Sequence, residues 1–138
     1  MFDIKAIRDN PEAFDTGMAR RGLGPQSPEL LAIDSDRRAA IAGAQAVQTE
    51  RNARSKAIGA AKAKGEDALS LIAEVAALKT RLQEGEEAAK ALEAKLYEAL
   101  ATLPNIPADD VPDGPDESAN MEVRKVGEPK AFDFEPRQ

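Results

Sequence analysis

A heptad stripe in the second half of the chain constrains its fold more than any other feature. Between residues 68 and 103, apolar residues or glycine recur at alternating spacings of three and four, the pattern of supercoiled helices. A less regular stripe occupies residues 30–61. The stripe positions are Leu30, Ile33, Arg37, Ala40, Ala44, Val47, Arg51, Arg54, Ile58 and Ala61, then Ala68, Leu71, Val75, Leu78, Leu82, Gly85, Ala89, Leu92, Leu96, Ala99 and Leu103.

The two stripes pair in one antiparallel register. If the chain folds back between residues 61 and 68, position 61 faces 68, position 44 faces 85 and position 30 faces 99. Unrelated stripes need not share a register, so the match predicts an intramolecular hairpin rather than a parallel dimer. Gly65 suits the left-handed backbone of the turn, and Pro104 prevents the return helix from continuing.

The remaining segments are shorter. Ser27 is expected to cap the outgoing helix, with Pro28 in its first turn, and residues 28–63 would project roughly 54 Å as a helix. Residues before the arm predict two short helices separated at Pro11. Their apolar residues are expected to pack at the base of the arm. These residues are Phe2, Ile4, Ile7, Phe14 and Met18.

The tail after Leu103 is rich in proline and turn-forming residues. Residues 121–126 (MEVRKV) predict one short strand, and Phe132 and Phe134 have no core of their own to enter. The sequence thus predicts an all-α fold, a long antiparallel two-helix coiled-coil hairpin with two short N-terminal helices and an extended C-terminal tail. We expect N-terminal helices over 1–26, the arm over 27–103, and a linker over 104–138 that leads to a further domain.

Composition excludes most chemistry for this chain. It contains no cysteine and no histidine, so neither a thiolate metal site nor a histidine base is available. The acidic pairs Asp109-Asp110 and Asp116-Glu117 lie in proline-rich loop sequence and are interpreted as solvated charge. We expect no catalytic residue, metal site or cofactor within the chain itself. The sequence has neither a membrane-length apolar run nor a signal peptide, so we expect a cytoplasmic protein.

Charge is distributed unevenly along the predicted arm. Residues 51–81 carry seven basic and three acidic side chains, a net charge of +4, which leaves −10 for the rest of a chain whose total is −6. The basic residues are Arg51, Arg54, Lys56, Lys62, Lys64, Lys79 and Arg81. Such a run is either a solvated helix face or a surface that contacts phosphates. We take these seven residues as the candidate nucleic-acid contacts.

A succession of short segments along the whole chain carries a family resemblance. The segments are residues 3–5 (DIK), 7–12 (IRDNPE), 20–22 (RRG), 50–59 (ERNARSKAIG), 62–67 (KAKGED), 104–107 (PNIP), 127–129 (GEP) and 132–134 (FDF). In their order around the predicted hairpin, they resemble the N-terminal tRNA-binding domain of bacterial seryl-tRNA synthetases. This resemblance implies an arm that reaches across a homodimer and holds the long variable arm of serine tRNA. It also implies that a class II catalytic domain, which activates serine with ATP and Mg²⁺, follows residue 138.

Two other functions remain open from the residues alone. The hairpin could be a structural spacer that docks a protein partner, or a stand-alone relative of the arm with another RNA target. No aromatic residue lies between Leu23 and Leu96, so an RNA would be recognised by shape and backbone rather than by base stacking. Because the stripe of each long helix is covered by the other helix of the same chain, we expect this chain to be monomeric. The resemblance, by contrast, implies a homodimeric parent enzyme.

Overall fold

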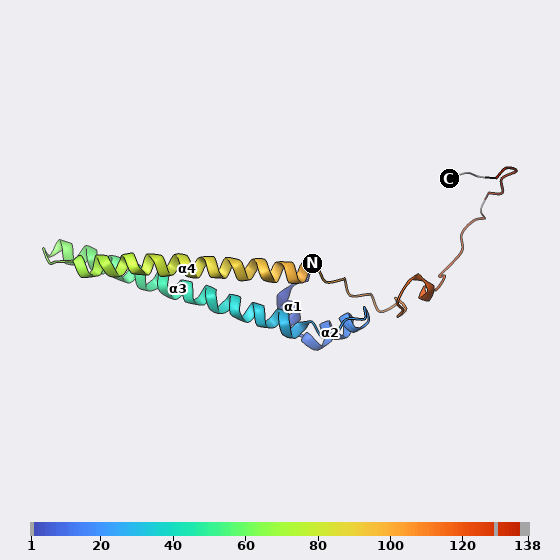
Figure 1. The fold of residues 1–138 in the computed structure, drawn as a ribbon, viewed down its shortest axis with the longest axis horizontal. Coiled ribbons are helices and arrows are strands. Elements are labelled where there is room, and N and C mark those ends of the chain that lie inside the picture. Colours follow the sequence, from blue (N-terminus) through green and yellow to red (C-terminus); the bar gives the residue numbers. More distant parts are fainter. Residues whose placement is uncertain (1, 129, 136–138) are drawn as a thin grey trace.

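The computed structural model describes residues 2–128 and 130–135. Its helices, in chain order, are α1 (Ile4–Asp9), α2 (Pro11–Ala19), α3 (Ser27–Ala63) and α4 (Leu69–Ala101), and the 3-10 turn η1 (Glu117–Ala119) follows them. Figure 1 shows α3 and α4 side by side as one long hairpin, with α1 and α2 at its base and the tail leaving from that end. The predicted all-α hairpin with two short N-terminal helices is confirmed.

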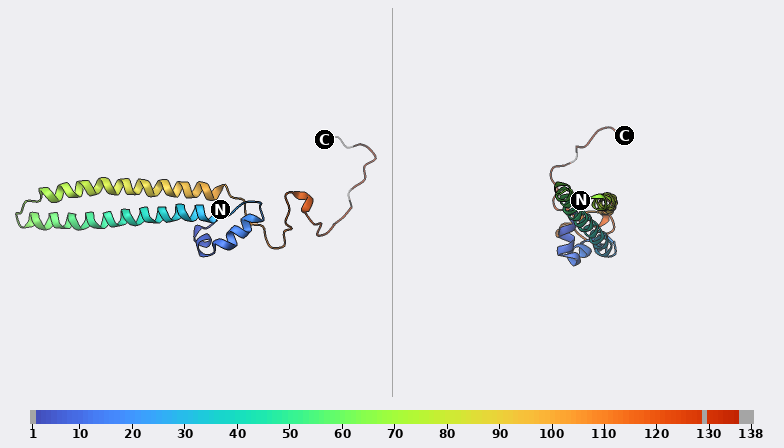
Figure 2. Two further views of the ribbon diagram at one scale, coloured as in Figure 1. Left: turned by 60° about the horizontal axis from the view of Figure 1, so that its bottom comes forward. Right: turned by 90° about the vertical axis from the view of Figure 1, so that its left-hand side faces the viewer.

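The two heptad stripes form the seam between α3 and α4. Every stripe position is buried or half-buried except Arg54, which is exposed. Gly85 lies against Ala44, its predicted partner in the register: a Cβ on Gly85 would lie 3.4 Å from the Ala44 Cβ. The left view in Figure 2 shows the two long helices running side by side along the arm.

Glycine closes the helix that leads into the turn at the tip. Gly65 has φ +74°, and the N–H of Glu66 donates to the Ala61 carbonyl at 3.0 Å, the long-range bond of a Schellman motif. On the return side, the Asp67 carboxylate accepts from the N–H of Leu69 at 2.9 Å. The N-cap residue of α4 is Ala68, whose side chain cannot accept a hydrogen bond. Asp67 therefore binds the helix from the position before the N-cap.

A small core joins α1 and α2 to the base of the arm. Its buried members are Ile7, Phe14, Met18, Leu30, Ile33, Leu96 and Leu100, with Phe2 and Ile4 partly buried against them. The rings of Phe2 and Phe14 meet edge to face, with centroids 5.2 Å apart. The five residues predicted to pack at the base therefore do so, and this packing fixes the short helices where the arm begins.

The start of α3 differs from the sequence prediction. Ser27 is already the first helical residue and does not cap the helix. Instead, the carboxylate of Asp15 on α2 accepts from the backbone N–H groups of Gln26 and Ser27, at 2.9 and 2.8 Å, and from the Ser27 hydroxyl. An acidic group near a helix N-terminus satisfies free donors and suits the helix dipole. The cap thus comes from another helix.

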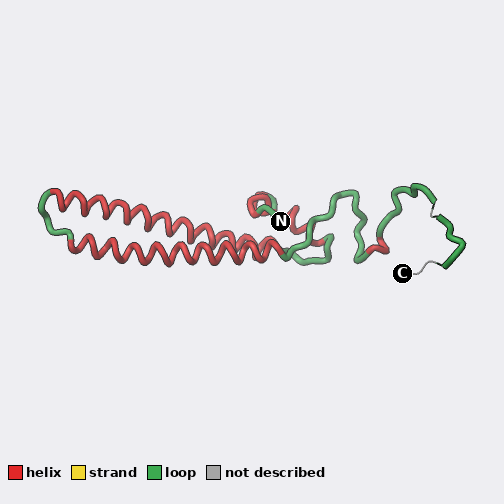
Figure 3. The backbone as a smooth tube through the Cα atoms, turned by 90° about the horizontal axis from the view of Figure 1, so that it is seen from above, coloured by secondary structure: helices red, strands yellow, loops and turns green. Residues whose placement is uncertain are grey.

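The tail is irregular, as predicted, but the short strand predicted for residues 121–126 is wrong. In the described part of the tail Figure 3 shows loop apart from η1, and Met121, Val123 and Val126 are exposed. A strand needs a second strand to complete its hydrogen bonds, and no other described segment provides one. Phe132 and Phe134 are exposed, as predicted. None of the described helices is long and apolar enough to cross a membrane.

Candidate nucleic-acid interface

The seven basic residues of the outer arm are displayed on its surface. Arg51 is half-buried and the other six are exposed. They do not form one cluster, because α3 and α4 present them on different sides of the seam. The α3 helix has 37 residues, so at 1.5 Å per residue it extends roughly 55 Å and carries these charges far from the base.

One side of the outer arm concentrates unpaired positive charge. Arg51 on α3 and Lys79 on α4 line the same shallow groove, whose other lining residues are Gln48, Leu82, Gln83 and the acidic Glu86. Lys62 follows Arg51 by eleven residues, which is about three helical turns, so it lies on the same side nearer the tip. We call the surface of Arg51, Lys62 and Lys79 the basic flank. In the described structure none of the three makes an ion pair.

The opposite side is electrically balanced. The Arg54 guanidinium lies 3.2 Å from a Glu74 carboxylate oxygen and 4.0 Å from one of Glu50. Arg81 lines a shallow groove with the same two glutamates. We call the surface of Glu50, Arg54, Glu74 and Arg81 the paired flank. The two positive and two negative charges of this surface cancel. The contacts with Glu50 and Glu74 hold the Arg54 side chain outside the seam, although its position in the sequence belongs to the stripe.

The remaining candidates lie on neither flank. Lys56 is exposed on α3, and Lys64 flanks the C-terminus of α3 at the tip turn. Arg51 differs from all the others because its stem packs in the seam. Its Nε atom is buried with no hydrogen-bond partner within the described residues, while its Nη1 lies 3.5 Å from the side-chain oxygen of Gln48. The guanidinium is thus held by packing, with its outer end toward the basic flank.

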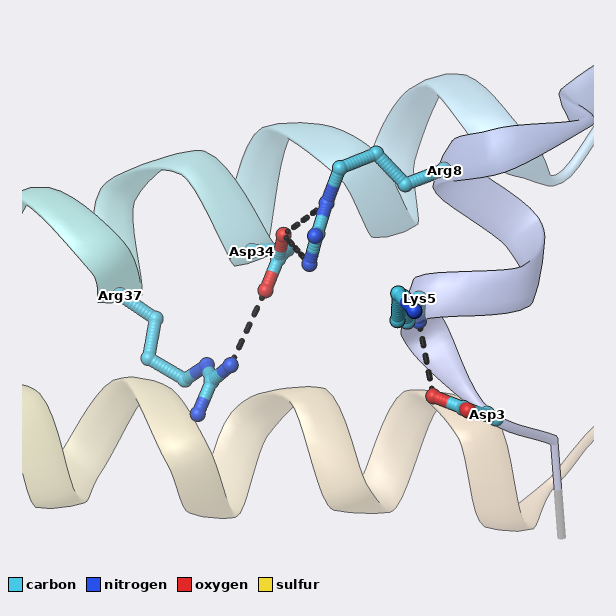
Figure 4. Close-up of polar contacts among 5 residues, drawn as sticks. All are labelled: Asp3, Lys5, Arg8, Asp34 and Arg37. Carbon is cyan, nitrogen blue, oxygen red and sulfur yellow. Dashed lines mark hydrogen bonds and ion pairs between the residues drawn. The ribbon is translucent and has the colours of Figure 1, made fainter.

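A second charged cluster lies at the base. Asp34 is only 2% exposed, and Arg8 of α1 donates to one of its carboxylate oxygens through Nε at 3.1 Å and Nη2 at 2.8 Å. Arg37 donates to the other oxygen at 3.1 Å. Figure 4 shows Arg8 reaching from α1 to Asp34 on α3, with Arg37 on the far side of the carboxylate. The cluster fastens α1 to the arm.

Burial by itself would raise the pKa of Asp34, but the hydrogen bonds and charges of Arg37 and Arg8 outweigh it and hold that pKa below its ordinary value. Burial and hydrogen bonds act in the same opposed way on Asp15, where the bonds from Ser27 and Gln26 leave the pKa lowered. Sequence reasoning missed both sites. The one available signal was Arg37, a charged residue at a stripe position where an apolar one is expected.

The described outer arm presents its charged side chains to solvent. Within residues 2–128 and 130–135, no three acidic side chains gather closely enough to hold a metal ion. Fold and charge together define a class of protein, a long two-helix arm on a small helical base with a positively charged outer side.

Comparison with known proteins places the chain within that class. The sequence model described as "Seryl-tRNA synthetase N-terminal domain" matches residues 1–107. The chain is 54% identical to a serine--tRNA ligase of Parvibaculum lavamentivorans, an alignment that covers 100% of this chain and 32% of the relative. It is 53% identical to that of Paramagnetospirillum magneticum, over 97% of this chain and 32% of the relative. The chain belongs to the seryl-tRNA synthetase N-terminal domain family.

A solved structure agrees. The crystal structure of seryl-tRNA synthetase from Pyrococcus horikoshii complexed with ATP superposes with a TM-score of 0.80 and 32% sequence identity, covering 89% of this chain and 28% of that one. The present chain therefore spans about a third of the length of the relatives that it matches.

Proposed function

We propose that this chain is the tRNA-binding arm of a serine--tRNA ligase and that it holds the long variable arm of serine tRNA. The observation that supports this best is the basic flank, an unpaired positive surface on one side of a rod roughly 55 Å long. A rod of this shape can reach an RNA element that lies far from the base. Membership of the seryl-tRNA synthetase N-terminal domain family indicates that this RNA is a tRNA.

The basic flank is the side that we propose to face the RNA. Lysine and arginine side chains attract phosphates, and neutral amides such as those of Gln48 and Gln83 can donate to phosphate and sugar oxygens. On the paired flank, Glu50 and Glu74 already occupy Arg54, and their carboxylates would repel a phosphate. Arg51, Lys62 and Lys79 are accordingly the principal contacts that we propose. Lys56, Lys64, Arg54 and Arg81 contribute mainly to the surrounding field.

The relatives support further proposals for the whole protein. We propose that residues 104–138 link the arm to a class II catalytic domain, where ATP and Mg²⁺ serve the activation of serine. We also propose that the parent enzyme is a cytoplasmic homodimer, and that the present chain is a monomer because its seam is closed within itself. Sedimentation velocity over a range of concentrations tests the monomer: a dimer at all concentrations would contradict the closed seam.

Binding measurements test the proposed function directly. The chain is titrated against three RNAs at several salt concentrations: serine tRNA, the same tRNA with its variable arm deleted, and a tRNA with a naturally short variable arm. We expect the intact serine tRNA to bind most tightly and the deletion to lower its affinity to that of the short-armed tRNA. Equal affinities for all three would contradict recognition of the variable arm.

A further inference from the structure

Arg20, just past the end of α2, binds the segment that leaves the arm. Its Nε donates to the Asp113 carboxylate at 2.7 Å and its Nη2 to the Val111 carbonyl at 2.6 Å. Its Nη1 lies 3.2 Å from the Ala108 carbonyl oxygen and 3.3 Å from that of Pro107. All three nitrogens of one guanidinium therefore bind residues 87–93 positions later in the sequence.

The neighbouring residues extend this contact along α2. Arg21 Nε donates to the Asn105 carbonyl at 2.8 Å. Between the two arginine contacts, Ile106 packs directly on Gly17, and a Cβ at Gly17 would lie 2.7–2.9 Å from three of its side-chain carbons. Only glycine leaves room for this packing. We call Gly17, Arg20, Arg21 and residues 105–113 the exit latch.

The exit latch replaces the support that regular structure would give. Residues 105–113 form no helix or strand, and one turn bond, from the N–H of Val111 to the Ala108 carbonyl at 3.1 Å, closes part of the loop. Loop carbonyls without such partners would be left to water, and the segment would be free to move. Arg20 instead binds three of these carbonyls and one side chain. From Met121 onward, by contrast, none of the described residues makes a hydrogen bond to α1, α2, α3 or α4.

We propose that Arg20 is a positioning residue that makes the arm, its base and the exit path to Asp113 one rigid unit, with rotational freedom beginning at Gly114. This proposal rests on the proposed function in one respect: the part of the protein that the exit path would join is the rest of a synthetase. A rigid exit fixes the direction in which the arm projects from that part, and so where the basic flank meets the RNA.

The planar guanidinium is essential to this role. Its donors point in fixed directions and reach several acceptors at once, whereas a lysine ammonium is a single compact group on a flexible stem. Arg20→Lys keeps the positive charge but loses most of the contacts. Asp113→Ala removes one contact from the loop side and leaves α2 untouched.

Spin-label distances test the latch. Because the chain has no cysteine, labels are attached without further changes through Glu12→Cys on α2 and Asp110→Cys on the exit path, both exposed positions. A second pair, Glu12→Cys with Glu122→Cys, spans the proposed point of freedom. Arg124→Lys, an exposed arginine beyond the latch, is the matched control. Helicity and thermal unfolding are followed by circular dichroism for every variant.

We expect a narrow distance distribution for the first pair in the parent chain and in Arg124→Lys, and a broad one for the second pair throughout. Arg20→Lys should widen the first distribution about twofold or more, and Asp113→Ala should widen it less, with the unfolding of the helices unchanged. A broad first distribution in the parent chain, or an unchanged one in Arg20→Lys, would overturn the proposal. The affinity of the parent chain for serine tRNA is measured separately. If the parent chain does not bind serine tRNA, the proposed function is contradicted, but the proposal for the latch is not.

Discussion

Single residues at the base link the short helices to the arm. Asp34 receives three hydrogen bonds from two arginines, and Asp15 receives three from the first turn of α3. Arg8 joins α1 to Asp34 on α3, and Asp15 joins α2 to the start of α3. Each contact therefore links two helices and is worth more than an exposed ion pair, which typically contributes about 1 kcal/mol or less. These two aspartates therefore hold the base in place beyond what its small apolar core provides.

Asp34→Asn tests the first of these contacts. A carboxylate with a lowered pKa stabilises the fold fully above its ordinary pKa of about 3.9, and this contribution is lost as the pH falls through the lower pKa of the folded state. We expect the variant to be less stable at pH 7 by about 2–3 kcal/mol. It should also lose less stability than the parent on acidification, so that the two stabilities converge as the pH falls through the lowered pKa of Asp34.

The measurement is thermal or denaturant unfolding from pH 7 to pH 2.5. Asp36→Asn is the matched control, since Asp36 is exposed on the same helix and forms none of the described ion pairs. The control should follow the parent chain at every pH. A constant difference between Asp34→Asn and the parent over the whole range would contradict the role given to the Asp34 charge.

At the scale of the elements, the seam depends on apolar contacts in one register. Leu82 is buried on α4, and its predicted partner across the seam is Val47. Leu82→Asp places an unpaired charge in this seam, and we expect it to lower the free energy of unfolding by about 3 kcal/mol or more. Leu69→Asp is the control, because Leu69 is exposed on the same helix and should change stability by about 0.5 kcal/mol at most. Equal effects on denaturant unfolding would show that the register is wrong.

Two helical glycines give opposite expectations. Gly43 has nothing within 4 Å of a potential Cβ, so Gly43→Leu should raise stability by about 0.5–1 kcal/mol through helix propensity. A Cβ atom on Gly85 would already touch the Ala44 Cβ, at 3.4 Å. The larger side chain of Gly85→Leu should therefore force the helices apart and lower stability by about 1–3 kcal/mol. Denaturant unfolding of the two variants measures the difference. A stabilised Gly85→Leu would contradict the close approach of the two helices at this point.

The elements could be predicted from sequence wherever a repeating or local signal existed. The stripes at Leu78 and Leu82 and the turn at Gly65 are such signals, because period and backbone conformation are local properties. The Asp15 cap and the Asp34 cluster were missed because they join residues 11–26 positions apart through tertiary contact. The predicted strand at 121–126 failed for the same reason: β-propensity forms a strand only where a partner strand exists.

At the scale of the whole molecule, charge and shape act together. The sequence showed that the outer arm is basic, but it could not show which side of the seam each residue occupies. That assignment depends on the pairing of α3 with α4, which brings Glu50 and Glu74 around Arg54 and leaves Arg51 and Lys79 free of carboxylate partners among the described ion pairs. The arm thus has two different sides, and we expect RNA to bind the basic flank only.

Two variants with the same net charge test this directly. Lys62→Gln/Lys79→Gln removes two positive charges from the basic flank, and Lys56→Gln/Arg81→Gln removes two from elsewhere on the outer arm. All four residues are exposed and off the seam, so circular dichroism should show both variants folded. The measurement is the affinity for serine tRNA as a function of salt concentration, because each phosphate contact releases counterions and steepens the salt dependence.

If the basic flank faces the RNA, Lys62→Gln/Lys79→Gln should weaken binding and reduce the slope of log affinity against log salt by about one to two units. Lys56→Gln/Arg81→Gln should keep a slope close to that of the parent chain and lose affinity only slightly, through the weaker overall field. Equal slopes and equal affinities in two folded variants would contradict one-sided binding of RNA by the arm.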